Sequence, residues 1–201
     1  MRFRGRSISE ERPVASLDLA YDTPSGAYAG IAGAGVATSH HGLQGLTLRE
    51  YLGYATQLNG GPTLDLGVTH AAYTEYYGGR SGTQYSEVYA GLAARRFTTR
   101  LSYSPSYFGS HTQTLYGEIG TAVQPARNWR LSAHAGLLTR VGGEATAASL
   151  RRTQYDWRLG VATVVRTFEI ELAWSGAGPD YAPNGRRQSR SGLTLALRRD
   201  F

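Results

Sequence analysis

The chain has 201 residues, of which 21 are basic, 15 acidic and none cysteine, and its formal net charge is +6. Without cysteine it has neither a disulfide framework nor a thiolate metal site. All the basic residues are arginines spread along the chain, which argues against a nucleic-acid-binding patch. No apolar run approaches the ~18 residues of a membrane helix. The opening MRFRGRSIS has no apolar segment of a secretory signal, so export is an inference from the rest of the chain.

Alternation of apolar and polar residues dominates the sequence, whereas helical periodicity is rare. In WRLSAHAGL, for example, Leu131 and Leu137 share a face opposite Arg130 and His134. Most such runs have ~9–13 residues, the length that a tilted strand needs to cross a bilayer. The sequence predicts about twelve strands, near residues 1–8, 13–22, 27–38, 45–58, 62–76, 85–95, 97–107, 112–124, 129–140, 153–165, 167–176 and 190–201.

The connections between these runs alternate in length. Every second one is tight, as in DTPSGA, LNGGP, ARRF, QPARN and VRTF, whereas the others are longer and polar, as in TRVGGEATAASLRR. Short turns at one end and long loops at the other are typical of outer-membrane barrels. We therefore expect residues 1–201 to form one domain, a transmembrane antiparallel up-and-down β-barrel with short periplasmic turns and longer extracellular loops.

The two faces of the predicted strands differ in composition. Leucine, valine, isoleucine and alanine fill one face, as expected for contact with outer-membrane lipid, and aromatic residues gather at strand ends, as in membrane interfaces. The predicted aromatic girdle comprises Tyr21, Tyr28, Phe97, Trp129, Phe168, Phe201, Tyr103, Trp157 and Trp174. The predicted lumen-lining charges are Arg2, Arg4, Arg6, Arg100, Arg130, Arg158, Glu87, Glu118, Glu169 and Glu171. We expect these charges to pair across the lumen, because a lone buried charge is costly.

The last predicted strand ends on an aromatic residue, Phe201. Closure of the barrel predicts that this strand pairs with a first strand at Arg2–Ile8. The segments RFRGRSISEERPVASLDLAYDTPSGAYAG, SEVYAGL, LSYSPSYFG, LSAHAGL and YDWRLGVA resemble the TorF-type porin family of proteobacterial outer membranes. The resemblance spans nearly the whole chain and implies an outer-membrane barrel, but names no substrate. The terminal aromatic resembles the signal that barrel-assembly machinery reads on its clients.

No group of residues in the sequence indicates catalysis or cofactor binding. His40 and His41 are adjacent and point to opposite faces, whereas His70, His111 and His134 are isolated in sequence, so we expect no metal site. Neither an H-x-S pair nor a G-x-S-x-G motif occurs, and GIAGAG is not followed by a helix. The sequence therefore predicts a protein that is not an enzyme and needs no cofactor. An outer-membrane enzyme acting on lipid is a weaker alternative.

About eight strands leave a barrel filled by side chains, and 16–18 leave a wide aqueous channel. With about twelve, we expect a narrow passive, porin-like channel for small hydrophilic solutes. The alternative is a closed barrel, plugged by its own charges, with a structural role or a protein partner docked at the long loops. The solute and the ion preference do not follow from these patterns, because arginines of the loops, such as Arg186 and Arg187, contribute to the net charge without lining the lumen.

Overall fold

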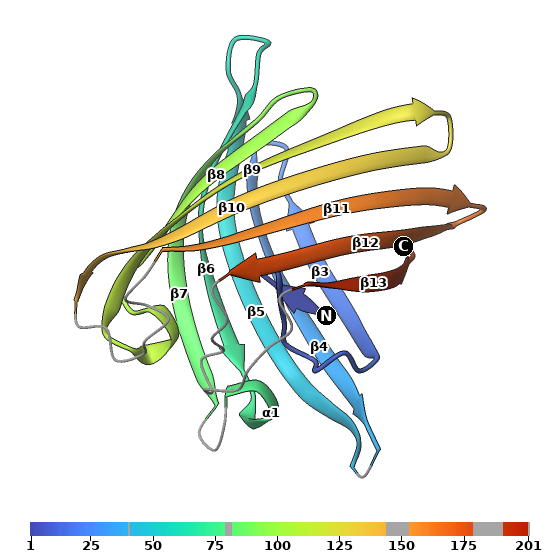
Figure 1. Ribbon diagram of the computed structural model, residues 1–201. Coiled ribbons are helices and arrows are strands. Elements are labelled where there is room, and N and C mark those ends of the chain that lie inside the picture. The colour runs from blue at the N-terminus through green and yellow to red at the C-terminus, as the bar shows by residue number, and fades with distance from the viewer. Residues whose placement is uncertain (40, 79–81, 144–152, 179–190, 201) are drawn as a thin grey trace.

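The computed structural model describes residues 1–39, 41–78, 82–143, 153–178 and 191–200. It confirms the predicted fold class: eleven strands, β3 to β13, follow one another in an antiparallel up-and-down sheet that curves into a barrel (Figure 1). These strands are β3 (Val14–Asp22), β4 (Ala27–Thr38), β5 (Gly42–Gln57), β6 (Thr63–Tyr73), β7 (Thr83–Ala93), β8 (Phe97–Ser104), β9 (Thr112–Ala126), β10 (Trp129–Gly143), β11 (Gln154–Val165), β12 (Phe168–Gly178) and β13 (Ser191–Arg198). The elements outside this sheet are β1 (Arg2–Phe3), β2 (Arg6–Ser7), helix α1 (Glu75–Gly78) and the 3-10 turn η1 (Tyr107–Gly109).

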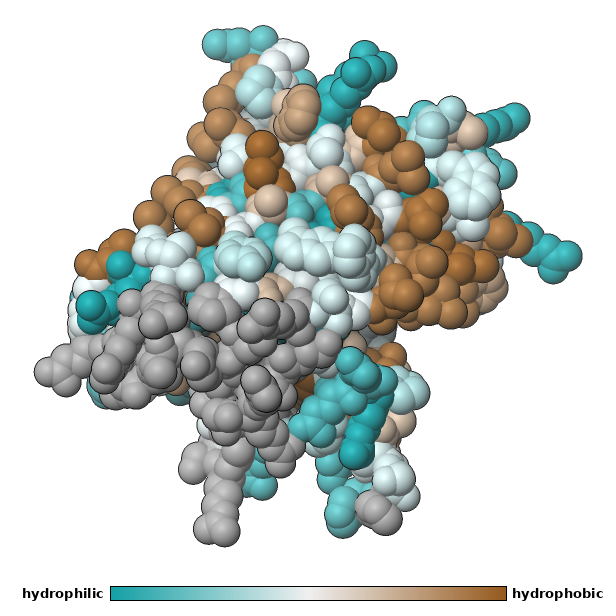
Figure 2. Space-filling view, in the orientation of Figure 1, coloured by the Kyte–Doolittle hydropathy of each residue, from teal (hydrophilic) through white to brown (hydrophobic). Residues whose placement is uncertain are grey.

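The alternation of the sequence becomes an apolar outside and a polar inside. Leu131, Val161, Leu172 and Leu195 are cross-strand partners on β10 to β13 and form a row on the outer face. Figure 2 shows apolar patches across the visible outer surface, with hydrophilic side chains toward its upper and lower ends. No helix in the described part of the chain is long and apolar enough to cross a membrane.

The turn between β5 and β6 has the backbone geometry of a tight hairpin loop. Between β5 and β6, Asn59 and Gly60 have φ values of 43° and 70°, and the Gly61 amide donates to the Leu58 carbonyl. Two consecutive positive φ angles define a type I′ turn, which matches the twist of the adjoining strands. Asparagine followed by glycine adopts this turn at low cost, so the LNGGP segment fixes the register of this hairpin.

The prediction of a first strand at Arg2–Ile8 paired with the last strand is wrong. This segment turns back on itself: β1 and β2 form a separate two-stranded sheet, which we call the N-terminal hairpin. Its turn residues Arg4 and Gly5 have φ values of 45° and 72°, so it is also a type I′ turn. Among the described residues no ladder joins β3 to β13, and with eleven strands these two edges run in the same direction.

The N-terminal hairpin lies inside the barrel, where it builds a core with the inner face of the wall. Phe3 packs against Tyr73, Tyr85 and Phe108, with ring centroids 5.7–6.2 Å apart. Ile8 follows the hairpin and is fully buried in the same core. Burial of this apolar area explains why residues 1–8 fold inward. The buried members of the core are Ile8, Val36, Leu46, Ala71, Tyr73, Tyr85, Tyr107, Tyr116 and Leu138.

The hairpin turn fits against β12 with no spare room, and this contact gives a testable prediction. A Cβ atom at Gly5 would meet the backbone of Gly176, whereas Gly60, which has a similar positive φ, has open space around it. Gly5→Ala should therefore lower the free energy of unfolding by more than about 1 kcal/mol, and by clearly more than Gly60→Ala, because only Gly5→Ala adds a clash to the backbone strain. Urea unfolding in detergent micelles measures both. Equal losses would mean that the turn does not contact β12.

Candidate channel interior

Arg4, at the tip of the N-terminal hairpin, is a cation enclosed in the interior. Its Nη2 donates to both carboxylate oxygens of Glu87 on β7, at 2.7 and 2.9 Å. Its guanidinium also lies 3.8 Å from the ring centroid of Tyr116 and 5.4 Å from that of Tyr107. The ion pair is almost entirely buried, with the Arg4 side chain 11% and the Glu87 side chain 5% exposed.

The surroundings keep Arg4 charged. Burial acts to lower its pKa, but Tyr107 and the Glu87 carboxylate outweigh burial and hold the pKa of Arg4 well above its ordinary value. Burial raises the pKa of Tyr107. Arg6 adds a second polar contact, because its Nη2 donates to the Gln154 side chain on β11 at 2.9 Å. The hairpin is thus attached to opposite parts of the wall.

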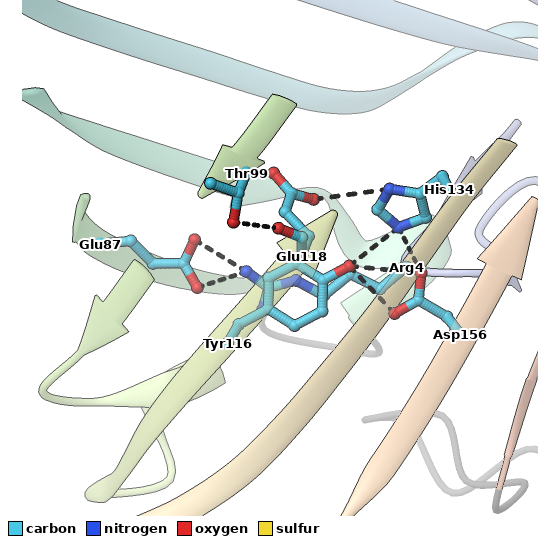
Figure 3. A network of polar contacts seen from close by, with 7 residues as sticks. All are labelled: Arg4, Glu87, Thr99, Tyr116, Glu118, His134 and Asp156. Atoms are coloured by element: carbon cyan, nitrogen blue, oxygen red, sulfur yellow. Dashed lines mark hydrogen bonds and ion pairs between the residues drawn. The ribbon is translucent and has the colours of Figure 1, made fainter. Parts of the chain in front are cut away.

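A second polar network lies beside Arg4 on the wall (Figure 3). The Tyr116 hydroxyl of β9 donates to Asp156 of β11 at 3.0 Å. His134 of β10 lies between these strands, with Nε2 2.9 Å from an Asp156 oxygen and Nδ1 3.9 Å from a Glu118 oxygen. Because Arg4 stacks on the Tyr116 ring, this network and the hairpin support each other. The network links β9, β10 and β11 through their side chains.

Toward the short-turn end, ion pairs continue along the wall. On β8, Arg100 Nη2 donates to Asp65 of β6 at 3.0 Å and lies 4.2 Å from the Tyr89 ring centroid. The Tyr28 hydroxyl of β4 donates to the same Asp65 and contacts the Tyr89 hydroxyl. Aspartate, arginine and two tyrosines from four strands thus form one connected group.

Another group of wall charges lies on β10 to β13. Arg130 Nη2 donates to Glu169 at 2.6 Å, and Arg198 Nη1 lies 3.7 Å from the same carboxylate oxygen. Arg158 Nη2 lies 2.7 Å from Glu171. Glu169 and Glu171 share the inner face of β12, and we call these five residues the arginine cluster. Two arginines compete here for one carboxylate.

The chain matches a known protein family along nearly its whole length. A model of a bacterial protein family of unknown function, Gcw_chp, matches residues 1–193. The chain belongs to the Gcw_chp family. A search of curated proteins found no match to this Gcw_chp sequence.

The solved structures that this chain resembles include a porin, NanC. The porin NanC superposes on the Gcw_chp chain with a TM-score of 0.65 at 10% identity, over 98% of this chain and 96% of NanC. OprD from Pseudomonas aeruginosa gives a TM-score of 0.46 at 12% identity, over 92% of this chain and 59% of OprD. At such low identity, the likeness to NanC shows a shared fold, that of an outer-membrane β-barrel.

All ten predicted lumen charges lie on the hairpin or on the inner face of this Gcw_chp barrel, but their partners differ from the expectation. Three of them, Arg2, Arg4 and Arg6, project from the hairpin and not from a wall strand. The Nε of Arg2 donates to the Gly5 carbonyl at 3.0 Å. On the wall, the pairs join strands that are adjacent or two apart instead of spanning the lumen. A strand two positions away places its charge within an arginine's reach, whereas the far wall does not. That these residues line a pore stays a prediction.

The predicted aromatic girdle is wrong at one position. Tyr28 points into the barrel, where it contacts Asp65 and Tyr89, because it shares the inner parity of Gly30 and Ala32 on β4. Trp157 and Trp174 pack edge to face on the outside with centroids 4.4 Å apart. Phe201 lies outside the described residues. The other predicted girdle residues have exposed or half-exposed side chains on the outer face: Tyr21, Phe97, Trp129, Phe168 and Tyr103.

Sequence reasoning missed the inner tyrosines. It also treated three histidines as isolated, and two of these, His70 and His134, have polar partners. Tyr89 and Tyr116 share strand parity with Glu87 and Glu118, so strand parity could have placed both inside. His134 in fact joins the Asp156 network. His70, on the outer face of β6, contacts its cross-strand partner Ser86 through Nδ1 at 2.9 Å. Within the described residues, no three potential ligands are grouped in a way that could hold a metal ion.

Proposed function

We propose that this Gcw_chp protein is a porin-like outer-membrane protein, a narrow passive channel for small hydrophilic solutes. The observation that carries the proposal is the inner face near the short turns: its arginines are paired yet solvent-exposed, while the outer face is aliphatic. A charged, hydrated interior inside an apolar band is the arrangement that polar solutes need to cross a bilayer. The fold shared with NanC supports the same function.

The proposal includes a location and an orientation. The short turns would face the periplasm and the longer loops the exterior, as in other outer-membrane barrels. The segments that resemble TorF-type porins support assignment to that group. Insertion would depend on barrel-assembly machinery reading the C-terminal strand, and a protein partner at the long loops belongs to the alternative below.

A closed barrel is the alternative, and the N-terminal hairpin favours it. The hairpin buries Arg4, Glu87 and Asp156, so the inner face is dry at its level. If the hairpin stays in place, the interior is a blind, water-filled vestibule at the short-turn end, and the protein has a structural or docking role. If it leaves a passage or moves, the protein conducts.

Planar-bilayer recording of the purified full chain separates these two functions. We expect discrete ohmic conductance steps smaller than those of 16-stranded porins, because the hairpin narrows the lumen. Arg4→Ala, which removes the buried contact with Glu87, should increase the conductance, whereas Arg95→Ala in the β7–β8 turn should leave it unchanged. Silence of both the parent and the Arg4→Ala protein would contradict the channel and favour the closed barrel.

We further propose that the protein is not an enzyme. The contact that an enzymatic alternative would use is the outward His70–Ser86 pair, since a histidine base beside a serine is the start of a nucleophilic site. Release of fatty acid from phospholipid vesicles by the purified protein, abolished by Ser86→Ala, would contradict this part of the proposal.

A further inference from the structure

The arginine cluster has an asymmetry between its cations and its anions. The Arg158 side chain is 43% exposed, whereas its partner Glu171 is 9% exposed. Arg130 and Arg198 are 35% and 64% exposed, whereas the carboxylate that they share, Glu169, is 23% exposed. In each pair the carboxylate lies closer to the wall and the guanidinium further into the water of the lumen.

The exposed guanidiniums keep donors for a further ligand. A guanidinium has five N–H donors in a planar fork. The ion pairs of the arginine cluster use one terminal nitrogen of each arginine: Nη2 of Arg130 and Arg158, and Nη1 of Arg198. Because these side chains are 35–64% exposed, the other donors remain available to a ligand in the lumen, and the fork geometry suits a carboxylate bound through two oxygens.

The charge of the arginine cluster is also unbalanced. Three arginines face two glutamates, which leaves one net positive charge among the five residues. The two other ion pairs of the lower wall, Arg49 with Asp18 and Arg100 with Asp65, are each one to one. Among these ion pairs, the positive excess lies on β10 to β13. It is close to the short-turn mouth, because Arg130 and Glu169 are the second residues of their strands and Arg198 ends β13.

We infer that the arginine cluster is a weak binding site for small organic anions that carry a carboxylate, and that it makes the channel prefer anions. The inference rests on the proposed function for its transport part and on the geometry alone for its binding part. An anion entering at the short-turn end meets the exposed guanidiniums within one Debye length, about 8 Å at physiological salt. A cation meets the same positive charge, while the carboxylates that would attract it are recessed behind the arginines.

Reversal potentials of the full chain in a potassium chloride gradient test the transport part. The parent should favour chloride over potassium. Arg130→Ala with Arg198→Ala leaves Glu169 without a cation and should lower the chloride-to-potassium permeability ratio by roughly fiftyfold, since one charge at roughly 7 Å in water changes the local concentration of each ion about threefold, in opposite directions for chloride and potassium. The matched control, Arg95→Ala with Arg96→Ala, removes the same charge from an exposed turn and should keep the ratio. Conductance without anion preference, or equal loss in the control, overturns the inference while leaving the channel intact.

Acetate titration tests the binding part independently of conductance. In micelles, the Nε–H signals of ¹⁵N-arginine in the parent should shift saturably with sodium acetate at constant ionic strength, and the Arg158 signal should lose most of this shift in the Arg130→Ala, Arg198→Ala double variant. If neither the parent nor any variant conducts, the channel proposal fails, and this titration alone decides whether the arginine cluster binds carboxylates. If the signals of the parent show no saturable shift, the arginine cluster is not a carboxylate-binding site.

Discussion

Arg4→Ala is expected to lower the free energy of unfolding by about 3–5 kcal/mol, because it leaves the Glu87 carboxylate buried without its cation. Glu87 has 5% of its side chain exposed and receives two hydrogen bonds from Arg4. The loss would also remove the stacking of Arg4 on Tyr116. Urea unfolding in detergent micelles, followed by tryptophan fluorescence, measures the change.

A double-mutant cycle identifies the cause of that loss. Glu87→Gln alone should also be strongly destabilising, since it leaves the Arg4 charge buried, but the two changes together should cost less than their sum. Arg95→Ala is the matched control for loss of one charge and should change stability by no more than about 0.5 kcal/mol. Additive losses of Arg4→Ala and Glu87→Gln would mean that the pair does not form and that the hairpin is not held by β7.

Leu172→Arg is expected to cost about 2–4 kcal/mol when the protein folds into lipid vesicles, because a guanidinium on the lipid face near the bilayer midplane loses its hydration. Leu172 lies near the centre of β12, in the outer row that also contains Leu131, Val161 and Leu195. Tryptophan fluorescence in a denaturant titration with vesicles measures this cost.

The control for Leu172→Arg is the same substitution at a position closer to the membrane surface. Val165 ends β11 at a tight turn and is exposed on the same outer face, so Val165→Arg should cost only about 0–1 kcal/mol in the same vesicles. Equal costs at both positions would show that depth in the bilayer does not govern them. No cost at Leu172 would mean that the faces are reversed and that the row meets water.

The fold could be predicted from sequence because its signal repeats in every strand. An apolar residue at every second position, as at Leu193, Leu195 and Leu197, is sufficient to place strands and faces once the solvent is lipid. The N-terminal segment could not be placed this way. Alternation is equally compatible with one strand of eight residues and with two short strands around a turn, and only the buried partners of Arg4 and Ile8 decide between them.

The candidate site shows the same limit. Strand parity assigned Arg100, Arg130 and Arg158 to the inside, since parity is a local property. Which carboxylate each arginine reaches depends on strand tilt and stagger, which one strand's sequence does not contain. The expectation of contacts across the lumen failed for this reason. Parity would have placed Tyr28 correctly, but its position at a strand end suggested a membrane interface instead.

The contacts of the N-terminal hairpin have a consequence for the order of folding. Arg4 is 83 residues from Glu87 along the chain, and Arg6 is 148 residues from Gln154. The sheet, by contrast, is built of hairpins between consecutive strands, which close short loops early. The hairpin can dock only after β7 and β11 are in place, so the transition state for folding should lack its contacts. Loosening the hairpin should therefore speed unfolding and leave the folding rate nearly unchanged, and an assembling barrel should remain hollow until its last step.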